Sequence, residues 1–453
     1  MLETGMLEAG MLEAGIDAFL QPLGPFERPP IIAAAISGGS DSLALGLMLA
    51  DWIAKGGGHL HVLSVDHGLR PEAREECAAV GRRFAVLPGC SAHLLEWRGP
   101  KPATGLQEAA RQARYRLMGE WCRERGILHL ALGHTADDQA ETFAMRRAQG
   151  SSPLGLAAMA AVRQRDGVRL LRPLLAVTRA ELRDWLTARG ESWIEDPSNS
   201  AARFERTRWR ASLAASGEGP AMAAQATGFG QARDRLERDA ARLLASAGRM
   251  HPAGYLTLDL NAWPASDPDV RVGILRQALL AVGGHEFAPA PDRLRQLAAA
   301  GPERIRTTLA GCILTARRGS LTICREAGNI RDHRPVSPGW AGTWDHRFAL
   351  KVATGLDPAG DDPVGGLAIA PLGESGQRQA VDKFGVRLKR HPVPEAARAA
   401  LPALWRGEIL AAQPHLGLGE GLAARLNPRH AVTTCGFTVA LRPPHTMYSS
   451  FPG

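Results

Sequence analysis

The segment from residue 29 to residue 42 limits most strongly what this chain can fold into. A pair of prolines precedes an apolar run at residues 31–36, and this run leads directly into Ser37-Gly38-Gly39. A short apolar run between proline and glycine is typical of a buried strand. Residues 42–53 then follow a helical pattern, and the polar residues before them suit the N-terminus of a helix. Strand, glycine turn and helix in this order predict the first unit of a parallel α/β sheet.

The same order repeats further along the chain. We expect strands at residues 61–65, 92–97 and 128–132, with helices at 72–84 and 105–125 between them. Strands that alternate with helices form a doubly wound parallel sheet, in which ligands bind at the carboxyl ends of the strands. The predicted fold class of this part is therefore α/β.

Beyond residue 199 the pattern changes, and a length of 453 residues suggests two or three domains. Helical patterns cover residues 230–247, 267–280 and 291–300, and a hairpin is expected at 307–323. We predict an N-terminal extension without assigned function, a doubly wound α/β domain, a mainly helical or α+β domain, and a small β-rich C-terminal domain. Their expected limits are residues 1–28, 29–215, 216–330 and 331–453.

The net charge of +8 favours a polyanionic partner. Only five of the 54 basic residues are lysine. Arginine suits phosphates and stacked bases because its planar group donates two parallel hydrogen bonds. The codon usage of a GC-rich genome is the alternative explanation of this excess.

The composition also excludes some classes of protein. Hydrophobic residues make up 45% and charged residues 22% of the sequence, as in soluble globular proteins. No apolar run approaches the roughly 18 residues of a membrane span, so no membrane association is expected. The six cysteines are scattered without a C-x-x-C pair, which disfavours a disulfide framework or a cysteine-based metal cluster. A reducing cytoplasm is the simplest location.

The loop Ser37-Gly38-Gly39-Ser40-Asp41-Ser42 has the residues expected of a phosphate site. Its glycines allow the backbone to approach a ligand closely, and the amides at the start of the following helix attract anions. The loop is neither a Walker A sequence nor a G-x-G-x-x-G turn. Its serine hydroxyls can donate to pyrophosphate oxygens, and Asp41 is placed to hold Mg2+. A plain helix cap rich in serine and glycine is the alternative.

This loop resembles the S-G-G-x-D-S signature of the PP-loop superfamily, the N-type ATP pyrophosphatases. The resemblance implies that ATP is cleaved between its α and β phosphates and that an adenylated intermediate forms. It implies that ATP and Mg2+ are used, with Asp41 in a catalytic and metal-binding role. The residues expected to bind the nucleotide here are Ser37, Gly38, Gly39, Ser40, Asp41 and Ser42. The signature leaves the acceptor open, since tRNA bases, amidations and NAD synthesis all use it.

Four further stretches are similar to the ordered motifs of the tRNA(Ile)-lysidine synthases. They are Val65-Asp66-His67-Gly68-Leu69-Arg70, residues 107–115, residues 133–142 and Glu195-Asp196-Pro197-Ser198-Asn199. The similarity covers residues 30–210 and, more loosely, the rest of the chain. One departure is Thr135, where the family usually has a second histidine, so a catalytic role at that position is in doubt.

This second resemblance implies a two-step ligation. The carbon-2 oxygen of the wobble cytidine in a CAU anticodon of tRNA(Ile) attacks the α phosphate of ATP. The ε-amine of free L-lysine then displaces AMP and leaves lysidine. Adenylation is needed because the cytosine carbonyl reacts poorly until its oxygen becomes a good leaving group.

Charged residues near two other strand ends are further candidates for the site. Asp66 and His67 end a strand at the ligand-binding edge, where they can meet the nucleotide, although a simple turn aspartate has the same pattern. Arg111 and Arg114 lie three residues apart on one helical face and can stabilise phosphate charge, with Arg111 as the catalytic candidate. A solvated basic stripe is the alternative.

A third group follows the expected strand at 128–132. His134, Asp137 and Asp138 suit a Mg2+ or lysine-ammonium site, or a general base for the incoming amine, and all three are catalytic candidates. A zinc site is disfavoured because the other histidines nearby show no ligand spacing.

The segment 203–210 interleaves arginines with two aromatic residues. Cationic groups and stacking rings are what single-stranded anticodon bases and their backbone require. An arginine-rich linker is the alternative. The candidate tRNA-binding residues are Arg203, Arg206, Arg208 and Arg210.

Three other functions compete with a lysine ligase. A cytidine thiolase of the PP-loop superfamily generally carries cysteine pairs, which this chain lacks. An ammonia-using synthetase for a small molecule would not need the basic C-terminal part. A catalytically inactive tRNA-binding protein would not need Asp41 or the Asp137-Asp138 pair.

Overall fold

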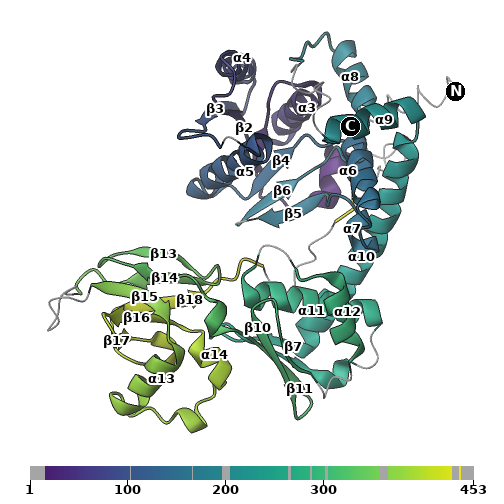
Figure 1. Cartoon of the computed structure of the whole chain (residues 1–453). Coiled ribbons are helices and arrows are strands. Elements are labelled where there is room, and N and C mark those ends of the chain that lie inside the picture. Colours follow the sequence, from purple (N-terminus) through teal and green to yellow (C-terminus); the bar gives the residue numbers. More distant parts are fainter. Residues whose placement is uncertain are drawn as a thin grey trace. The chain divides into compact units, whose positions relative to one another are not determined.

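The computed structural model describes residues 16–102, 104–165, 167–195, 205–263, 267–285, 288–300, 305–356, 366–430 and 438–439. The chain forms two compact units (Figure 1). The first unit contains the residues up to Arg235 and the C-terminal end from residue 436, and the second contains Leu236–Cys435. The division falls inside the long helix α10 (Gly219–Ala247). The four-part domain limits expected above stay a prediction.

The first unit is built on a six-stranded sheet in the order β3-β2-β1-β4-β6-β5. The strands β3, β2, β1, β4 and β6 are parallel, and β5 is antiparallel to β6. The predicted doubly wound sheet is therefore confirmed. Its strands are β1 (Ile31–Ala35), β2 (His59–Asp66), β3 (Cys90–Glu96), β4 (His129–Leu132), β5 (Val162–Arg165) and β6 (Val168–Leu171).

The order of the strands locates the ligand-binding edge. From β1, the chain passes to β2 on one side and only later returns to β4 on the other side. In doubly wound sheets, ligands bind outside the carboxyl ends of the strands at such a switch point. The loops that follow β1 and β4 therefore border the expected site.

Helices cover both faces of this sheet, because the strands are apolar on both sides. Along β1, Ile32 and Ala34 pack on one face with α3, α4 and α8, whereas Ala33 packs on the other face with α5. The helices are α3 (Ser40–Gly56), α4 (Ala73–Ala85), α5 (Leu106–Glu124) and α8 (Arg179–Ala188). A parallel sheet buried on both faces needs such continuous apolar strands.

Further helices complete the first unit. Ala140 and Phe143 of α6 pack against Leu213 of α9 and Met222 of α10, which places the helices after residue 205 against the helix that follows β4. The segment before β1 also joins the core, since Ile16, Phe19, Leu20 and Leu23 are buried there. The added elements are α2 (Asp17–Leu20), η1 (Gln21–Leu23), α6 (Ala136–Ala148), α7 (Pro153–Leu156) and α9 (Glu205–Ser216).

The second unit begins with an antiparallel sheet in the order β7-β8-β11-β10-β9, which packs with α11, α12 and the end of α10. The expected hairpin corresponds to β10 and β11, but it belongs to a five-stranded sheet that the sequence pattern did not predict. The elements are β7 (Gly248–Met250), β8 (Leu256–Asp259), η3 (Leu260–Ala262), α11 (Pro268–Gly283), α12 (Pro291–Ala299), β9 (Arg306–Leu309), β10 (Cys312–Arg317), β11 (Ser320–Arg325) and η5 (Ala327–Asn329).

Two smaller antiparallel sheets follow, in the orders β12-β15-β16-β17 and β13-β14-β18. They agree with the expected β-rich C-terminal part. The elements are β12 (Arg334–Pro335), β13 (Ala341–Trp344), β14 (Phe348–Val352), β15 (Leu367–Pro371), α13 (Gly373–Asp382), η6 (Leu388–Arg390), α14 (Glu395–Ala399), β16 (Pro402–Arg406), β17 (Ile409–Ala412), η7 (Pro414–Leu416) and β18 (Leu422–Leu426). Among the residues that the structure describes, no helix has the length and apolar character to cross a membrane.

We predict that Phe84→Ala strongly destabilises the first unit. Phe84 is 0% exposed, and its ring packs directly against Gly46. A Cβ on Gly46 would lie 2.6 Å from Cζ of this ring. Removing a buried aromatic ring lowers the free energy of unfolding by about 3–5 kcal/mol. Urea unfolding measures this loss of stability. Hydrogen exchange of the β1 and β2 amides shows whether the loss affects the sheet of the first unit. Val86→Ala is the control, since Val86 is 80% exposed, and an equal loss in both variants would contradict the packing argument.

Candidate adenylation site

The loop between β1 and α3 is held in shape by its own serines and by one glycine. Ser42 Oγ accepts a hydrogen bond from the Ser37 amide at 3.1 Å and donates to the Gly39 carbonyl at 3.0 Å. Gly38 has a φ of +88°, and a Cβ on it would lie 2.6 Å from Ile194 Cδ1. Only glycine fits this backbone conformation and this close contact.

The N-terminus of α3 differs from the N-termini of the two neighbouring helices. At α8, Thr178 Oγ1 accepts from the Glu181 amide and the Glu181 carboxylate accepts from the Thr178 amide. At α6, the Thr135 amide donates to Asp138 Oδ2 at 2.9 Å. The N-cap of α3 is Gly39, which makes no side-chain cap. Within the described residues, no side chain therefore caps the first amides of α3, which agrees with a phosphate site.

A close backbone contact brings the loop after β4 against the start of α3. A Cβ on Gly133 would lie 3.0 Å from Ser42 Cα and 3.1 Å from the carbonyl carbon of Asp41. The absence of a side chain at residue 133 lets the two loops touch. The acidic residues after β4 consequently lie beside Asp41.

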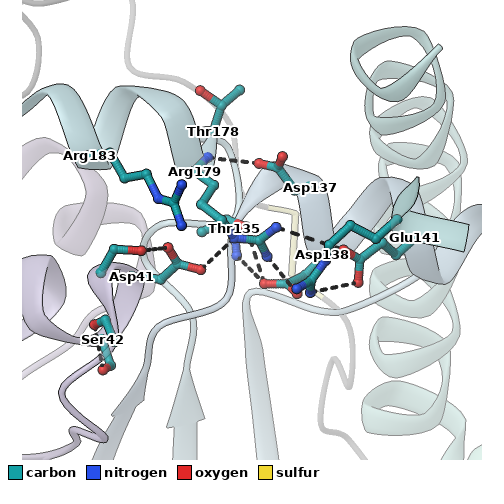
Figure 2. Close-up of polar contacts among 12 residues, drawn as sticks. Asp41, Ser42, Thr135, Asp137, Asp138, Glu141, Thr178, Arg179 and Arg183 are labelled. Atoms are coloured by element: carbon teal, nitrogen blue, oxygen red, sulfur yellow. Dashed lines mark hydrogen bonds and ion pairs between the residues drawn. The ribbon is translucent and has the colours of Figure 1, made fainter. Parts of the chain in front are cut away.

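Arg179, the first residue of α8, bridges these acidic groups (Figure 2). Its Nε donates to Asp41 Oδ2 at 2.9 Å, and its Nη2 lies 3.4 Å from Asp138 Oδ1. Its Nη1 lies 3.8 Å from Glu141 Oε1. The backbone amide of Arg179 donates to Asp137 Oδ2 at 2.7 Å. One arginine thus connects carboxylates from α3 and α6.

Two of the arginines expected to bind tRNA also pair with these acids. Arg206 Nε donates to Glu141 Oε2 at 2.7 Å and its Nη2 donates to Asp138 Oδ1 at 3.1 Å, while Arg210 Nε donates to Glu141 Oε1 at 2.7 Å. Arg206 and Arg210 share one face of α9, one helical turn apart. Arg208 is exposed instead, and Arg203 lies outside the described residues.

The pKa shifts agree with a site of stable, alternating charges. Burial alone would raise the pKa of Asp138, but the charges of Arg206 and Arg179 and the hydrogen bond from the Thr135 amide lower it. Burial would likewise lower the pKa of Arg179, but Asp138 and Asp41 raise it above its ordinary value. The carboxylate and the guanidinium therefore keep their charges throughout the neutral range.

His134 is uncharged in this environment. Burial is the largest cause that lowers its pKa, from 6.5 to about 3, and Arg172 acts in the same direction while Asp138 opposes both. Its Nδ1 is buried and has no hydrogen-bond partner among the residues that the structure describes. A neutral imidazole can accept or donate a hydrogen bond to a substrate, but at this pKa it is a weak base.

The other predicted residues lie at the same edge of the sheet with different partners. The Asp66 carboxylate accepts from the Gly68 amide at 2.8 Å, which is the turn alternative considered above. His67 follows Asp66 at the end of β2, and its ring lies edge-on to Trp97. Arg111 Nη2 lies 3.4 Å from the Tyr115 hydroxyl, and burial lowers the pKa of Arg114. Arg179 therefore connects Asp41, Asp137 and Asp138 through hydrogen bonds. Asp66, His67, Arg111 and Arg114 lie at the same edge of the sheet but have other partners.

The sequence pattern assigns no role to Glu141 or Arg179, and it leaves the role of Thr135 in doubt. Glu141 was part of a recognised motif, and its position three residues after Asp138 on a helix was the available signal. Thr135 is the N-cap residue of α6 and orients Asp138 through its amide and, at 3.2 Å, its hydroxyl. For Arg179 the only signal was the Thr178-x-x-Glu181 pattern, which predicts a helix start. Within the described ranges, no three His, Cys, Asp or Glu side chains are grouped as metal ligands.

Comparisons with known proteins identify the family. A model described as a PP-loop domain matches residues 11–216. The tRNA(Ile)-lysidine synthases of Ruegeria pomeroyi and Rhizobium meliloti are 34% and 37% identical to the chain, over 88% and 87% of it and 92% and 88% of their own lengths. The chain belongs to the tRNA(Ile)-lysidine synthase family. The resemblance drawn from the sequence motifs is thus confirmed.

Two other matches complete the comparison. The tRNA(Ile)-lysidine synthase of a Bradyrhizobium species is 40% identical over 66% of this chain and 86% of its own length. A solved structure described as U34-tRNA thiolase NcsA from Methanococcus maripaludis matches 48% of this chain and 78% of its own, at 15% identity and a TM-score of 0.41. This structural likeness is too low to bear on function.

We predict that His134 makes the protein sensitive to acid. Because the folded-state pKa lies below the ordinary value of 6.5, the unfolded chain takes up a proton first, and stability is lost as the pH falls below that value. When the pH falls from about 7 to about 5.5, the free energy of unfolding should decrease in the wild type. In His134→Asn this decrease should be about 1 kcal/mol smaller. Urea unfolding at both pH values measures this. The exposed His333 provides the control variant His333→Asn, and identical pH profiles for all three proteins would contradict the prediction.

We also predict that Gly38→Ala impairs ATP binding. An L residue in the left-handed region costs about 1–2 kcal/mol, and the added methyl would push the loop away from Ile194. Loss of one hydrogen bond to a charged phosphate, roughly 1.5–3 kcal/mol, weakens binding by about tenfold or more. Calorimetric titration with MgATP measures this. Gly57→Ala carries similar strain, at a φ of +73° in open space, and should leave the affinity unchanged.

Proposed function

We propose that this chain, an ATP-dependent tRNA-modifying enzyme of the ligase kind, joins lysine to carbon 2 of the wobble cytidine of a CAU-anticodon tRNA(Ile). The observation that carries the proposal is the uncapped N-terminus of α3 beside the carboxylate of Asp41, at the switch point of the sheet. Free helix amides bind phosphate, and the adjacent acids provide for a cationic partner. Family membership supplies the chemistry of the acceptor.

In the first step, the loop residues hold the triphosphate of ATP. The amides of α3 and the hydroxyls of Ser37 and Ser40 would bind phosphate oxygens, which withdraws charge as the cytidine oxygen forms a bond to the α phosphorus. The bond from that phosphorus to the bridging oxygen breaks, and pyrophosphate leaves with its electrons. Arg111 and Arg114, at the same edge of the sheet, supply positive charge for this departure.

Asp41 is the residue that we expect to hold Mg2+. Its carboxylate stands at the start of α3 beside the loop, and one carboxylate together with phosphate oxygens and waters is a usual set of ligands for this ion. When bound, Mg2+ would neutralise the charge that develops on pyrophosphate. Its Oδ2 faces Arg179 and its Oδ1 accepts from Ser40 Oγ at 2.8 Å, so the ion would have to displace the guanidinium.

In the second step, lysine carries an ammonium group that must lose a proton before it attacks carbon 2. The half-buried carboxylate of Asp137 is our candidate to bind this cation and accept its proton, because Asp138 and Glu141 are buried and paired with arginines. The amine then forms the carbon–nitrogen bond, and AMP leaves with the former carbonyl oxygen. Neutral His134 would bond to a substrate group through its Nδ1, which has no partner within the described part of the chain.

The arginine helix α9 is our candidate for contact with the anticodon. Arg208 is exposed, while Arg206 and Arg210 already neutralise Glu141. The outward position of Arg208 is suited to phosphate contacts, which position a nucleic acid without reading its sequence. We place the reaction in the cytoplasm, in keeping with the free state of the described cysteines.

The alternative of a cytidine thiolase is disfavoured by the cysteines of the first unit. Burial raises the pKa of Cys77 to about 11 and that of Cys122 to about 12, and it also raises the pKa of Cys90. A thiol nucleophile reacts as the thiolate, which these environments oppose. None of the three is suited to carry sulfur.

The deciding experiment is lysine transfer. The purified protein is incubated with ATP, Mg2+, labelled lysine and either a CAU-anticodon tRNA(Ile) transcript or an elongator methionine tRNA. We expect label in the first tRNA only, whereas pyrophosphate release without lysine-linked tRNA would refute the proposal.

Asp41→Ala should abolish adenylation and leave tRNA binding nearly unchanged. Loss of tRNA binding in that variant would mean that the loop has been misassigned.

A further inference from the structure

Arg179 occupies the centre of the candidate site, although no motif assigned it a role. Its guanidinium lies between Asp41 of α3 and Asp138 of α6, and Figure 2 shows it directed to both. Its side chain is 18% exposed, so a substrate can reach it. Its backbone is held separately, because its amide donates to Asp137. The side chain can therefore change partners while α8 stays in place.

With Arg179 in place, the carboxylates around it are paired with its guanidinium. Asp41, Asp138 and Glu141 approach different nitrogens of one planar group, at 2.9, 3.4 and 3.8 Å. Metal ligands converge instead on a single point. This explains why the described residues contain no grouped metal ligands even though four carboxylates lie together. Without Arg179, like charges from α3 and α6 would repel each other.

We infer that Arg179 is a positioning residue that serves as the resident cation of the site. It neutralises Asp41 and Asp138 while no nucleotide is bound, so that a divalent metal does not bind there alone. When ATP enters with its metal, Arg179 gives up Asp41 and turns to a phosphate oxygen, with which a guanidinium forms an equally strong charged hydrogen bond. This inference rests on the proposed ATP site, and it assigns the order in which metal and nucleotide arrive.

The test is metal binding in the absence of ATP, with Mn2+ as the probe and electron paramagnetic resonance as the readout. The wild type should bind Mn2+ only weakly. Arg179→Gln should bind it about tenfold more tightly or better, since a neighbouring charge shifts an ionic equilibrium by roughly one to three powers of ten. Arg179→Lys keeps the charge and should bind Mn2+ as weakly as the wild type. Unchanged Mn2+ affinity in Arg179→Gln would overturn the inference.

Arg189→Gln is the matched control. Arg189 follows α8 and pairs with Asp51 of the same helix α3, at 3.1 Å, away from the loop. A variant that only loosens the contact between α8 and α3 should leave Mn2+ binding unchanged. Tighter Mn2+ binding in Arg189→Gln would show a general loosening and would count against a special role of Arg179. Circular dichroism of each variant establishes that it is folded.

Adenylation kinetics provide a second readout. Arg179→Lys cannot bridge two carboxylates with a planar group, so its kcat should fall while its KM for MgATP changes little. Equal kcat in Arg179→Lys and the wild type would contradict a positioning role. The Mn2+ titration uses neither tRNA nor lysine. If it succeeds while the wild type fails to transfer lysine, the proposed acceptor is wrong but the role of Arg179 stands.

Discussion

Repulsion between like charges is the constraint on which the site depends. Asp41 belongs to the start of α3, whereas Asp138 and Glu141 belong to α6, and the close contact of Gly133 with α3 forces these elements together. Such an arrangement is stable only if cations are interposed, and Arg179, Arg206 and Arg210 provide them. Each comes from a different part of the chain than the acids it neutralises. The packing of α8 and α9 onto the sheet and onto α6 is therefore coupled to the electrostatics of the site.

Much of the first unit could be predicted from the sequence, for a simple reason. Its strands are short apolar runs that end in glycine or charged residues, and its helices follow with clear periodicity, so local pattern and tertiary structure agree. The loop after β1 and the acids after β4 were both found in this way, because the ends of neighbouring parallel strands must meet at one edge. That their loops touch could be expected from the order of strands. That Gly133 is the residue at which they touch could not be predicted.

The residues that were missed have long-range partners. Arg179 is an ordinary helix-starting arginine until the fold places it opposite Asp41, 138 positions away. Nothing local indicates that Arg206 and Arg210 both pair with Glu141, whose side chain is 2% exposed, and their expected contact with nucleic acid stays a prediction. In the second unit, short strands such as β7 and β9 carry too few residues for a periodic signal. The five-stranded sheet there appears only when distant strands pair.

The three helix starts at the site also set how a nucleotide can lie in it. At α6 and α8 the amides of the N-cap residues Thr135 and Thr178 donate to Asp138 and Glu181, whereas the N-cap of α3 is Gly39, which has no side chain. On the proposed function, the start of α3 is therefore the helix end, among these three, where the backbone itself would meet the phosphates of ATP. The side chains that cap the other two helices then serve the opposite charge, because they keep the carboxylates of the site in fixed positions.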